Sequence, residues 1–231
     1  MEKVLYLAQL PDSTSAEHFR NHDMHSLADS LMSEITGVAR LSLLLDDDTV
    51  KPAAQWRIKS NDAMPEAVLS ICLDSANHHP KIQKILGRHL VGIRGFLVSE
   101  SEALINPARG KGRSEGSVQL CTFSKKPGMS QSELIQRWRG DHTAIAIDNQ
   151  SSLAYRQNLV ICELGGDTTG IDAIVEEQFP VKAMNSIEAL FDAEQNPEEL
   201  KKRRTIMQKS CERFIDFSTI NVVHLSEFIF K

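Results

Sequence analysis

The sequence lacks a long hydrophobic run and has no dense patch of positive charge. No apolar stretch approaches the roughly 20 residues that span a bilayer. The first apolar residues, Val4–Ala8, follow no basic segment and no small-residue cleavage site, so we expect neither a membrane span nor a signal peptide. The 26 lysines and arginines are dispersed among 31 acidic residues, which predicts no nucleic-acid binding. A cytoplasmic protein is expected.

The sequence also lacks the usual motifs of metal, redox and nucleotide chemistry. The four cysteines are isolated, which is typical of small buried side chains in a reducing compartment and not of disulfides or metal ligands: Cys72, Cys121, Cys162 and Cys211. No phosphate loop, serine-nucleophile elbow or Cys-x-x-Cys occurs. His22 and His25 share a helix face, but the sequence places no third ligand near them. We therefore expect no metal site and no cofactor.

A polar, glycine-rich segment divides the 231 residues nearly in half. Between Ser99 and Ser117 the sequence loses its hydrophobic periodicity, which is typical of a linker or an exposed loop. The expected organisation is a first module at residues 1–100, a linker at 101–116 and a second module at 117–231.

Both modules show the same order of expected elements. In the second, a strand at 117–123 precedes a helix at 130–148, strands at 153–162 and 171–179, a helical stretch at 186–214 broken near Pro197, and a final strand at 219–230. The first gives strands at 4–10, 37–45, 67–73 and 90–98, with helices at about 15–31 and 80–86. This β-α-β-β-α-β order is the ferredoxin-like plan, and an offset near 117 residues indicates an internal duplication.

The expected fold is therefore α+β, with two tandem ferredoxin-like modules. A sheet covered by helices on one face leaves its other face apolar, and two such faces packed together form an α+β barrel within one chain. Such a barrel often keeps an apolar cavity between sheet and helices, where a small ligand fits. The chain would be a monomeric pseudo-dimer, although its outer surfaces could still form a homodimer.

The helix expected at 130–148 carries the most informative residues. Ser130 and Glu133 have the spacing of a capping box. Four residues share one apolar stripe: Leu134, Trp138, His142 and Ile145. A histidine on that stripe is either a hydrogen-bonded core residue or a functional group, and the spacing leaves both readings open.

Residues 117–230 resemble the EthD family of dimeric α+β-barrel proteins. Trp138-Arg-Gly-Asp-His142 resembles the family's Trp-x-x-x-His element, Tyr155-Arg-Gln-Asn158 its Tyr-x-Gln-Asn-His strand, and Gly170–Glu176 the segment that opens its third strand. The chain departs from the pattern at Leu159, where the family usually has a histidine. The first module keeps the plan of elements but not these motifs.

The resemblance implies a protein that breaks down or modifies hydrophobic small molecules. We expect a cofactor-independent enzyme for an aromatic or polyketide-like compound, acting by proton transfer at His142 with Tyr155 as a polar assistant. Trp138 would line the cavity and Asn158 would orient a polar substrate group. A dehydratase, an isomerase or cyclase, and a cofactor-free monooxygenase all remain open. The alternative is a non-catalytic protein that binds a hydrophobic ligand or haem.

Overall fold

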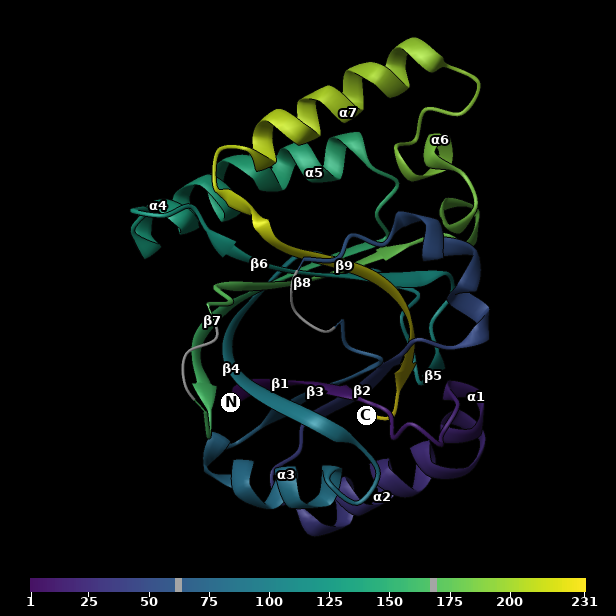
Figure 1. Cartoon of the computed structure of the whole chain (residues 1–231), viewed down its shortest axis with the longest axis vertical. Helices are drawn as coiled ribbons and strands as arrows, with labels where there is room; N and C mark the ends of the chain where they lie inside the picture. Colours follow the sequence, from purple (N-terminus) through teal and green to yellow (C-terminus); the bar gives the residue numbers. More distant parts are fainter. Residues whose placement is uncertain (61–63, 167–169) are drawn as a thin grey trace.

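Eight antiparallel strands, contributed by both halves of the chain, close into a barrel (Figure 1). The computed structural model describes residues 1–60, 64–166 and 170–231. Neighbouring strands follow the order β2-β3-β1-β4-β7-β8-β6-β9, and pairing of β2 with β9 closes the ring. The short strand β5 pairs with the C-terminal end of β9. The mixed α+β class expected from the sequence is therefore present.

The first half supplies four barrel strands and the helices between them. Its elements are β1 (Glu2–Gln9), α1 (Ala16–His18), a π-helix (Phe19–Asp23), α2 (Met24–Glu34), β2 (Arg40–Leu45), a 3-10 helix (Asp48–Trp56), β3 (Ala67–Leu73), a 3-10 turn (Ala76–His78), α3 (His79–Leu86) and β4 (Val91–Leu104). Ser15 caps the first helix by accepting a hydrogen bond from the His18 backbone N–H.

The second half supplies the other four strands. Its elements are β5 (Gly112–Arg113), β6 (Ser117–Lys125), α4 (Gln131–Ile135), a π-helix (Gln136–His142), α5 (Thr143–Asn149), β7 (Ala154–Leu164), β8 (Ala173–Phe179), a 3-10 helix (Val181–Met184), α6 (Ile187–Leu190), α7 (Pro197–Cys211) and β9 (Ile215–Ile229). Asn196 caps α7, and Pro197 occupies its first turn.

The two halves have the same strand order and are joined edge to edge. In each half the second strand pairs with the third, the third with the first, and the first with the fourth. The seam between β4 and β7 joins the halves on one side of the barrel, and the seam between β2 and β9 joins them on the other.

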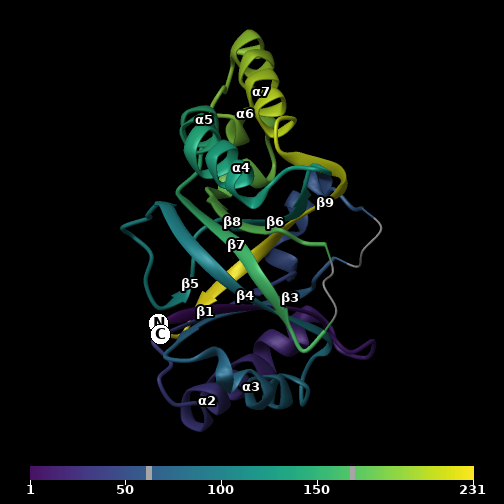
Figure 2. The same cartoon turned by 90° about the vertical axis from the view of Figure 1, so that its left-hand side faces the viewer.

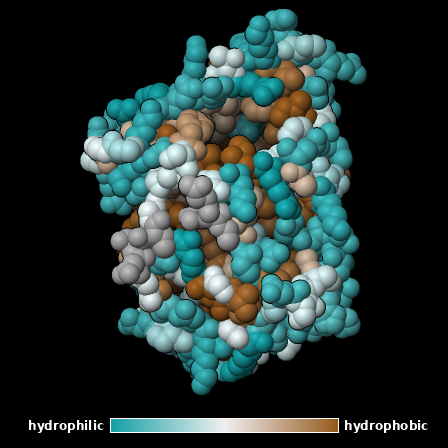
Figure 3. Space-filling view, viewed as in Figure 1, coloured by the Kyte–Doolittle hydropathy of each residue, from teal (hydrophilic) through white to brown (hydrophobic). Residues whose placement is uncertain are grey.

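Helices cover the two opposite sides of the barrel (Figures 1 and 2). Helices α2 and α3 lie against the sheet of the first half, and α4, α5 and α7 lie against that of the second half. Hydrophilic residues dominate both helical ends in the space-filling view, and hydrophobic residues are visible in the recessed middle (Figure 3). No helix of the described residues has the length and apolarity that a membrane crossing requires.

The apolar side chains form three main layers. One lies between α2, α3 and the first sheet, and another lies between α4, α5, α7 and the second sheet. The third fills much of the barrel interior and includes Leu5, Phe96, Leu120, Ile174 and Leu225. Side chains alternate between the two faces of a strand, so one set lies under the helices and the other lies inside the barrel. Each sheet is therefore packed on both faces.

The structure corrects three local expectations. Strand β4 continues to Leu104, inside the segment expected to be a linker, because residues 99–104 pair with the start of β7. Strand β9 begins at Ile215, four residues before the expected start, because its first residues pair with the end of β6. Cys162 is exposed near the end of β7 and is not a buried hydrophobic side chain.

Candidate functional site

Trp138 and His142 lie on the π-helix between α4 and α5. The capping box forms as expected, with Ser130 accepting from the Glu133 backbone N–H and Glu133 accepting from that of Ser130. A π-helix holds an extra residue compared with an α-helix. The buried face therefore continues from His142 to Ala146, whereas Ile145 is only partly buried. The expected stripe is wrong at this last position.

Thr143 completes the hydrogen bonding around the π-helix. Its hydroxyl donates to the carbonyl oxygen of Arg139 at 2.8 Å and approaches that of Trp138 at 3.3 Å. Widened helical segments satisfy their backbone carbonyls less regularly than an α-helix does, so a nearby hydroxyl stabilises this irregular backbone. Segments of this kind often occur at functional sites.

Tyr155 on β7 is the centre of a buried hydrogen-bond cluster. The Trp138 indole N–H donates to its hydroxyl at 3.1 Å, and the Gln157 amide donates to it at 3.3 Å. The same amide nitrogen donates to Thr143 at 3.0 Å. Within the described residues, the hydroxyl hydrogen of Tyr155 has no acceptor. Burial raises the pKa of Tyr155, so this group keeps its proton and can act as a hydrogen-bond donor.

His142 is a buried, uncharged base at neutral pH. It is 5% exposed, its Nδ1 lies 2.9 Å from the Ser210 hydroxyl on α7, and its ring meets Phe214 edge-on. Burial, with a smaller effect of Arg213, lowers the pKa of His142 to about 4. Because Ser210 occupies Nδ1, Nε2 is the nitrogen left to exchange a proton with a ligand.

Glu177 is a site residue that no sequence motif indicated. It lies directly across from Tyr155 in the β7–β8 pair and is 5% exposed. Its carboxylate accepts a hydrogen bond from Ser152 at 2.5 Å and forms no ion pair with the described cationic side chains. Burial raises the pKa of Glu177 to about 7. The signal in the sequence was the pair Glu176–Glu177, since alternation along a strand turns one of two neighbours toward each face.

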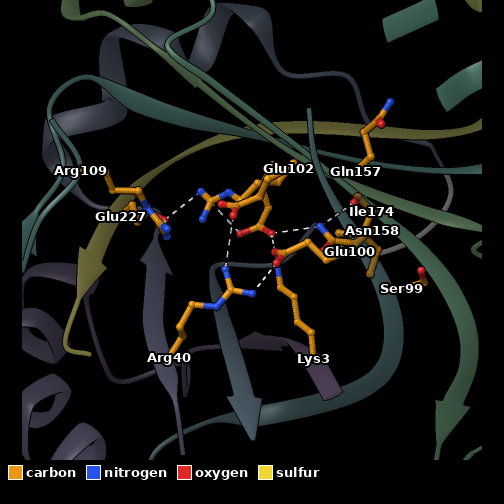
Figure 4. A network of polar contacts seen from close by, with 12 residues as sticks. Lys3, Arg40, Ser99, Glu100, Glu102, Arg109, Gln157, Asn158, Ile174 and Glu227 are labelled. Atoms are coloured by element: carbon orange, nitrogen blue, oxygen red, sulfur yellow. Dashed lines mark hydrogen bonds and ion pairs between the residues drawn. The ribbon is translucent and has the colours of Figure 1, made fainter. Parts of the chain in front are cut away.

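Asn158 and Glu176 lie on the opposite face of the sheet from this cluster. Asn158 donates to the Ile174 carbonyl at 2.9 Å and to the Glu176 carboxylate at 3.0 Å. Figure 4 shows Asn158 pointing into the network inside the barrel and Gln157 pointing away from it. The structure therefore brings together Trp138, His142 and Tyr155 in one layer but places Asn158 in another.

Trp138, His142 and Tyr155 lie between the second sheet and its helices, and we call them the helix-side cluster. This cluster is closely packed. Trp138 is 1% exposed and Tyr155 is 2% exposed. Phe123 contacts both Trp138 and Phe214, and Phe214 in turn contacts His142. These side chains are almost completely covered by the helices above the sheet. In the described ranges, no three His, Cys, Asp or Glu side chains converge so that they could hold a metal ion.

Comparison with protein families finds one match, and it lies within the second half of the chain. Residues 126–218 match the family model described as the EthD domain, so the resemblance seen in the sequence motifs is confirmed. The matched segment contains the helix-side cluster and Ser210. No curated protein matches the chain.

Solved structures share the fold across nearly the whole chain. An anthrone oxidase-like protein superposes with a TM-score of 0.60 at 12% identity, covering 100% of this chain and 91% of that one. A chlorite dismutase variant from Candidatus Nitrospira defluvii gives a TM-score of 0.50 at 11% identity, covering 98% and 90%. At these identities the likeness concerns the fold alone.

Proposed function

We propose that this chain is a cofactor-independent enzyme that transfers a proton on a hydrophobic, aromatic or polyketide-like small molecule. The reaction occurs between the helices α4, α5 and α7 and the outer face of the second sheet. His142 accepts the proton, Tyr155 binds the substrate oxygen and Trp138 forms a wall of the site. The protein is cytoplasmic, and its chain consists of two ferredoxin-like modules that arose by duplication.

The observation that carries the proposal is the hydrogen bonding of Tyr155. Its hydroxyl accepts from Trp138 and Gln157, which fixes the oxygen and leaves the hydrogen to be donated. A donor held in this way stabilises negative charge that develops on a carbonyl or phenolate oxygen when a neighbouring carbon loses a proton. Dehydration, cyclisation and cofactor-free oxygenation of such substrates can all begin with this step.

His142 and Glu177 have the properties of a general base and a general acid, respectively. The lowered pKa of His142, about 4, keeps the imidazole neutral at a pH where histidine is usually charged. The raised pKa of Glu177, about 7, keeps its carboxyl protonated at a pH where glutamate is usually ionised. Paired groups with opposite shifts are a common basis for general acid–base catalysis. Glu177 would return the proton to the substrate after His142 has removed one.

The π-helix supports binding in a layer that is closely packed. Its irregular hydrogen bonds make it the part of the helical cover that can rearrange at least cost, and it carries both Trp138 and His142. Movement of this segment would open space beside Tyr155 without breaking a barrel strand.

Anthrone is a suitable probe, because one structural neighbour is named anthrone oxidase-like. This tricyclic ketone has an acidic methylene group beside its aromatic rings and a carbonyl oxygen that Tyr155 could bind. Incubation in D2O without oxygen, followed by NMR, would report proton removal directly as deuterium incorporation. The expected result is enzyme-dependent exchange that His142→Asn abolishes and Tyr155→Phe slows by roughly 10- to 100-fold.

Two buried residues outside the cluster provide matched controls. His224 resembles His142, since its Nδ1 lies 3.0 Å from Ser117 and burial lowers its pKa to about 4. Tyr6 is a fully buried tyrosine of the first sheet. His224→Asn and Tyr6→Phe should therefore keep the exchange rate. Binding of anthrone with an exchange rate that His142→Asn leaves unchanged would instead favour a non-catalytic carrier of hydrophobic ligands.

A further inference from the structure

One end of the barrel interior contains a buried ion-pair network that the proposed reaction does not use (Figure 4). Lys3 on β1 lies 2.5 Å from Glu100 on β4 and 2.6 Å from Glu176 on β8. Arg156 on β7 lies 2.9 Å from Glu227 on β9. These charges belong to five strands of both halves and replace the apolar side chains that fill the rest of the interior.

A small cavity of about 30 Å³ adjoins this network. Its walls include one acidic side chain, Glu100, and five cationic ones: Lys3, Arg40, Arg109, Arg156 and Lys231. Four of these cations are already ion-paired with Glu100, Glu176 or Glu227, so the case for an anion rests on the donors that remain without a partner. The volume suits a group of a few heavy atoms.

Several hydrogen-bond donors on these walls have no acceptor among the described residues. The Nε–H groups of Arg156 and Arg40 are both buried without a partner, and Arg156 as a whole is only 2% exposed. Ser42 and Ser70 are cross-strand neighbours that also line the cavity. Neither serine hydroxyl has a hydrogen-bond partner in the described part of the chain. An unsatisfied buried Nε–H is costly, so an acceptor bound beside Arg156 or Arg40 would be stabilised.

A second cavity of about 520 Å³ shares part of the same wall. Lys3, Arg40, Cys72 and Glu100 line both cavities, while Leu97, Val98 and Ile161 give the larger one an apolar side. A molecule with a charged group at one end and an apolar part at the other matches this pair of cavities.

We propose that this end of the barrel binds the carboxylate group of a small organic anion, with Arg156, Arg40 and the hydroxyls of Ser42 and Ser70 as donors. A planar three-atom carboxylate fits the small cavity better than a five-atom tetrahedral phosphate does. Arginine donors are suited to bidentate contacts with carboxylates. The donors come from both halves of the chain, so the bound anion stabilises the closed barrel. The site lies on the opposite face of the sheet from Tyr155 and does not depend on the proposed reaction.

Acetate, phosphate and chloride, compared at pH 7 and equal ionic strength, test the proposal through the melting temperature of the full chain. Acetate is expected to raise the melting temperature above its value in chloride. A dissociation constant near 1 mM would give a shift of roughly 5 to 10 °C at 100 mM acetate. An equal melting temperature in acetate and chloride would overturn the proposal, and stabilisation by phosphate but not by acetate would overturn the carboxylate assignment.

Two variants test the named donors against a matched control. The Arg40 side chain is 39% exposed and the Arg57 side chain, in an ion pair with Asp46 away from the small cavity, is 35% exposed. Arg40→Gln should weaken acetate binding about tenfold, the effect of losing one hydrogen bond to a charged group, whereas Arg57→Gln should not. The double variant Ser42→Ala, Ser70→Ala keeps every charge and should also weaken binding. Unchanged acetate affinity in both variants contradicts the proposed site.

Discussion

At the scale of single residues, the opposite pKa shifts of His142 and Glu177 predict an acidic activity optimum. His142 must be neutral to accept a proton, so activity should rise as the pH passes its pKa of about 4. Glu177 must be protonated to donate one, so activity should fall as the pH passes about 7. The kcat/KM for anthrone exchange, measured from pH 3 to 9, should give a bell-shaped curve. In Glu177→Gln the alkaline limb should disappear, and a limb that persists would exclude Glu177 as the acid.

The Glu177 carboxyl should also change the stability of the fold with pH. Its pKa is raised from 4.5 to about 7, so between these values the native state holds a proton that the unfolded state has released. Stability from this group is complete below pH 4.5 and is lost as the pH rises to about 7, by an amount on the order of 3 kcal/mol. Urea denaturation at pH 5 and pH 8 should show that Glu177→Gln gains stability relative to the wild type at the higher pH. An equal difference at both values would contradict the raised pKa.

The sequence predicts which residue types matter here, but not every partner that makes them functional. The motif spacing identified Trp138, His142 and Tyr155, and the structure places all three in one layer. Ser210, which fixes His142, is 68 residues away along the chain and has no motif. Asn158 belongs to the same sequence motif as Tyr155, yet the odd spacing between them places it on the other face of the strand.

At the scale of elements, replacing Gly140 in the π-helix Gln136–His142 should raise the stability of the fold and lower its activity. This residue is exposed, and an added Cβ would meet no atom within 4 Å. Glycine is a poor residue for a helix, so Gly140→Ala should stabilise the fold by about 0.5–1 kcal/mol. If the π-helix must rearrange to admit a ligand, the same change should lower kcat/KM. Denaturation and exchange kinetics on one preparation would test both effects, and a variant that is more stable and equally active would argue against movement of this segment.

Hydrophobic periodicity predicted most of the helices and strands, but it could not reveal the π-helix Gln136–His142. A hydrophobic stripe at spacings of four and three looks the same for an α-helix as for a helix with one extra residue. The difference emerges only in which side chains are buried, Ala146 and not Ile145. The 3-10 helix Asp48–Trp56 was also missed, since its stability depends on long-range contacts, such as the Trp56 indole N–H donating to the Ala183 carbonyl at 3.2 Å.

At the scale of the whole molecule, two hydrogen-bonded seams join the halves. The sequence indicated that the two sheets would bury their apolar faces against each other, and these side chains do fill the barrel interior. The sequence did not predict the edge pairings β4–β7 and β2–β9. Strand edges pair through backbone hydrogen bonds, which do not depend on a particular pattern of side chains. These seams leave none of the eight barrel strands as a free edge, and free edges promote association with other chains.

The ion pairs inside the barrel should make the two halves unfold together. Lys3 of the first half contacts Glu176 of the second, and both side chains are almost completely buried. Among the described residues, Lys3→Met would leave Glu176 with one distant cationic neighbour, Arg156 at 3.9 Å, so we expect a loss of about 3 kcal/mol. The exposed pair of Lys182 and Glu194 offers a control, since Lys182→Met should change stability little.

Native-state hydrogen exchange would show which strands lose amide protection in Lys3→Met. Because both seams hold the halves in one closed sheet, amides of β3 in the first half and of β6 in the second should lose protection by the same free energy. Loss confined to β3 would mean that the halves are separate folding units and that the seams contribute little. Equal loss would mean that the barrel is the cooperative unit, so a ligand bound among the strands of both halves would stabilise the whole chain.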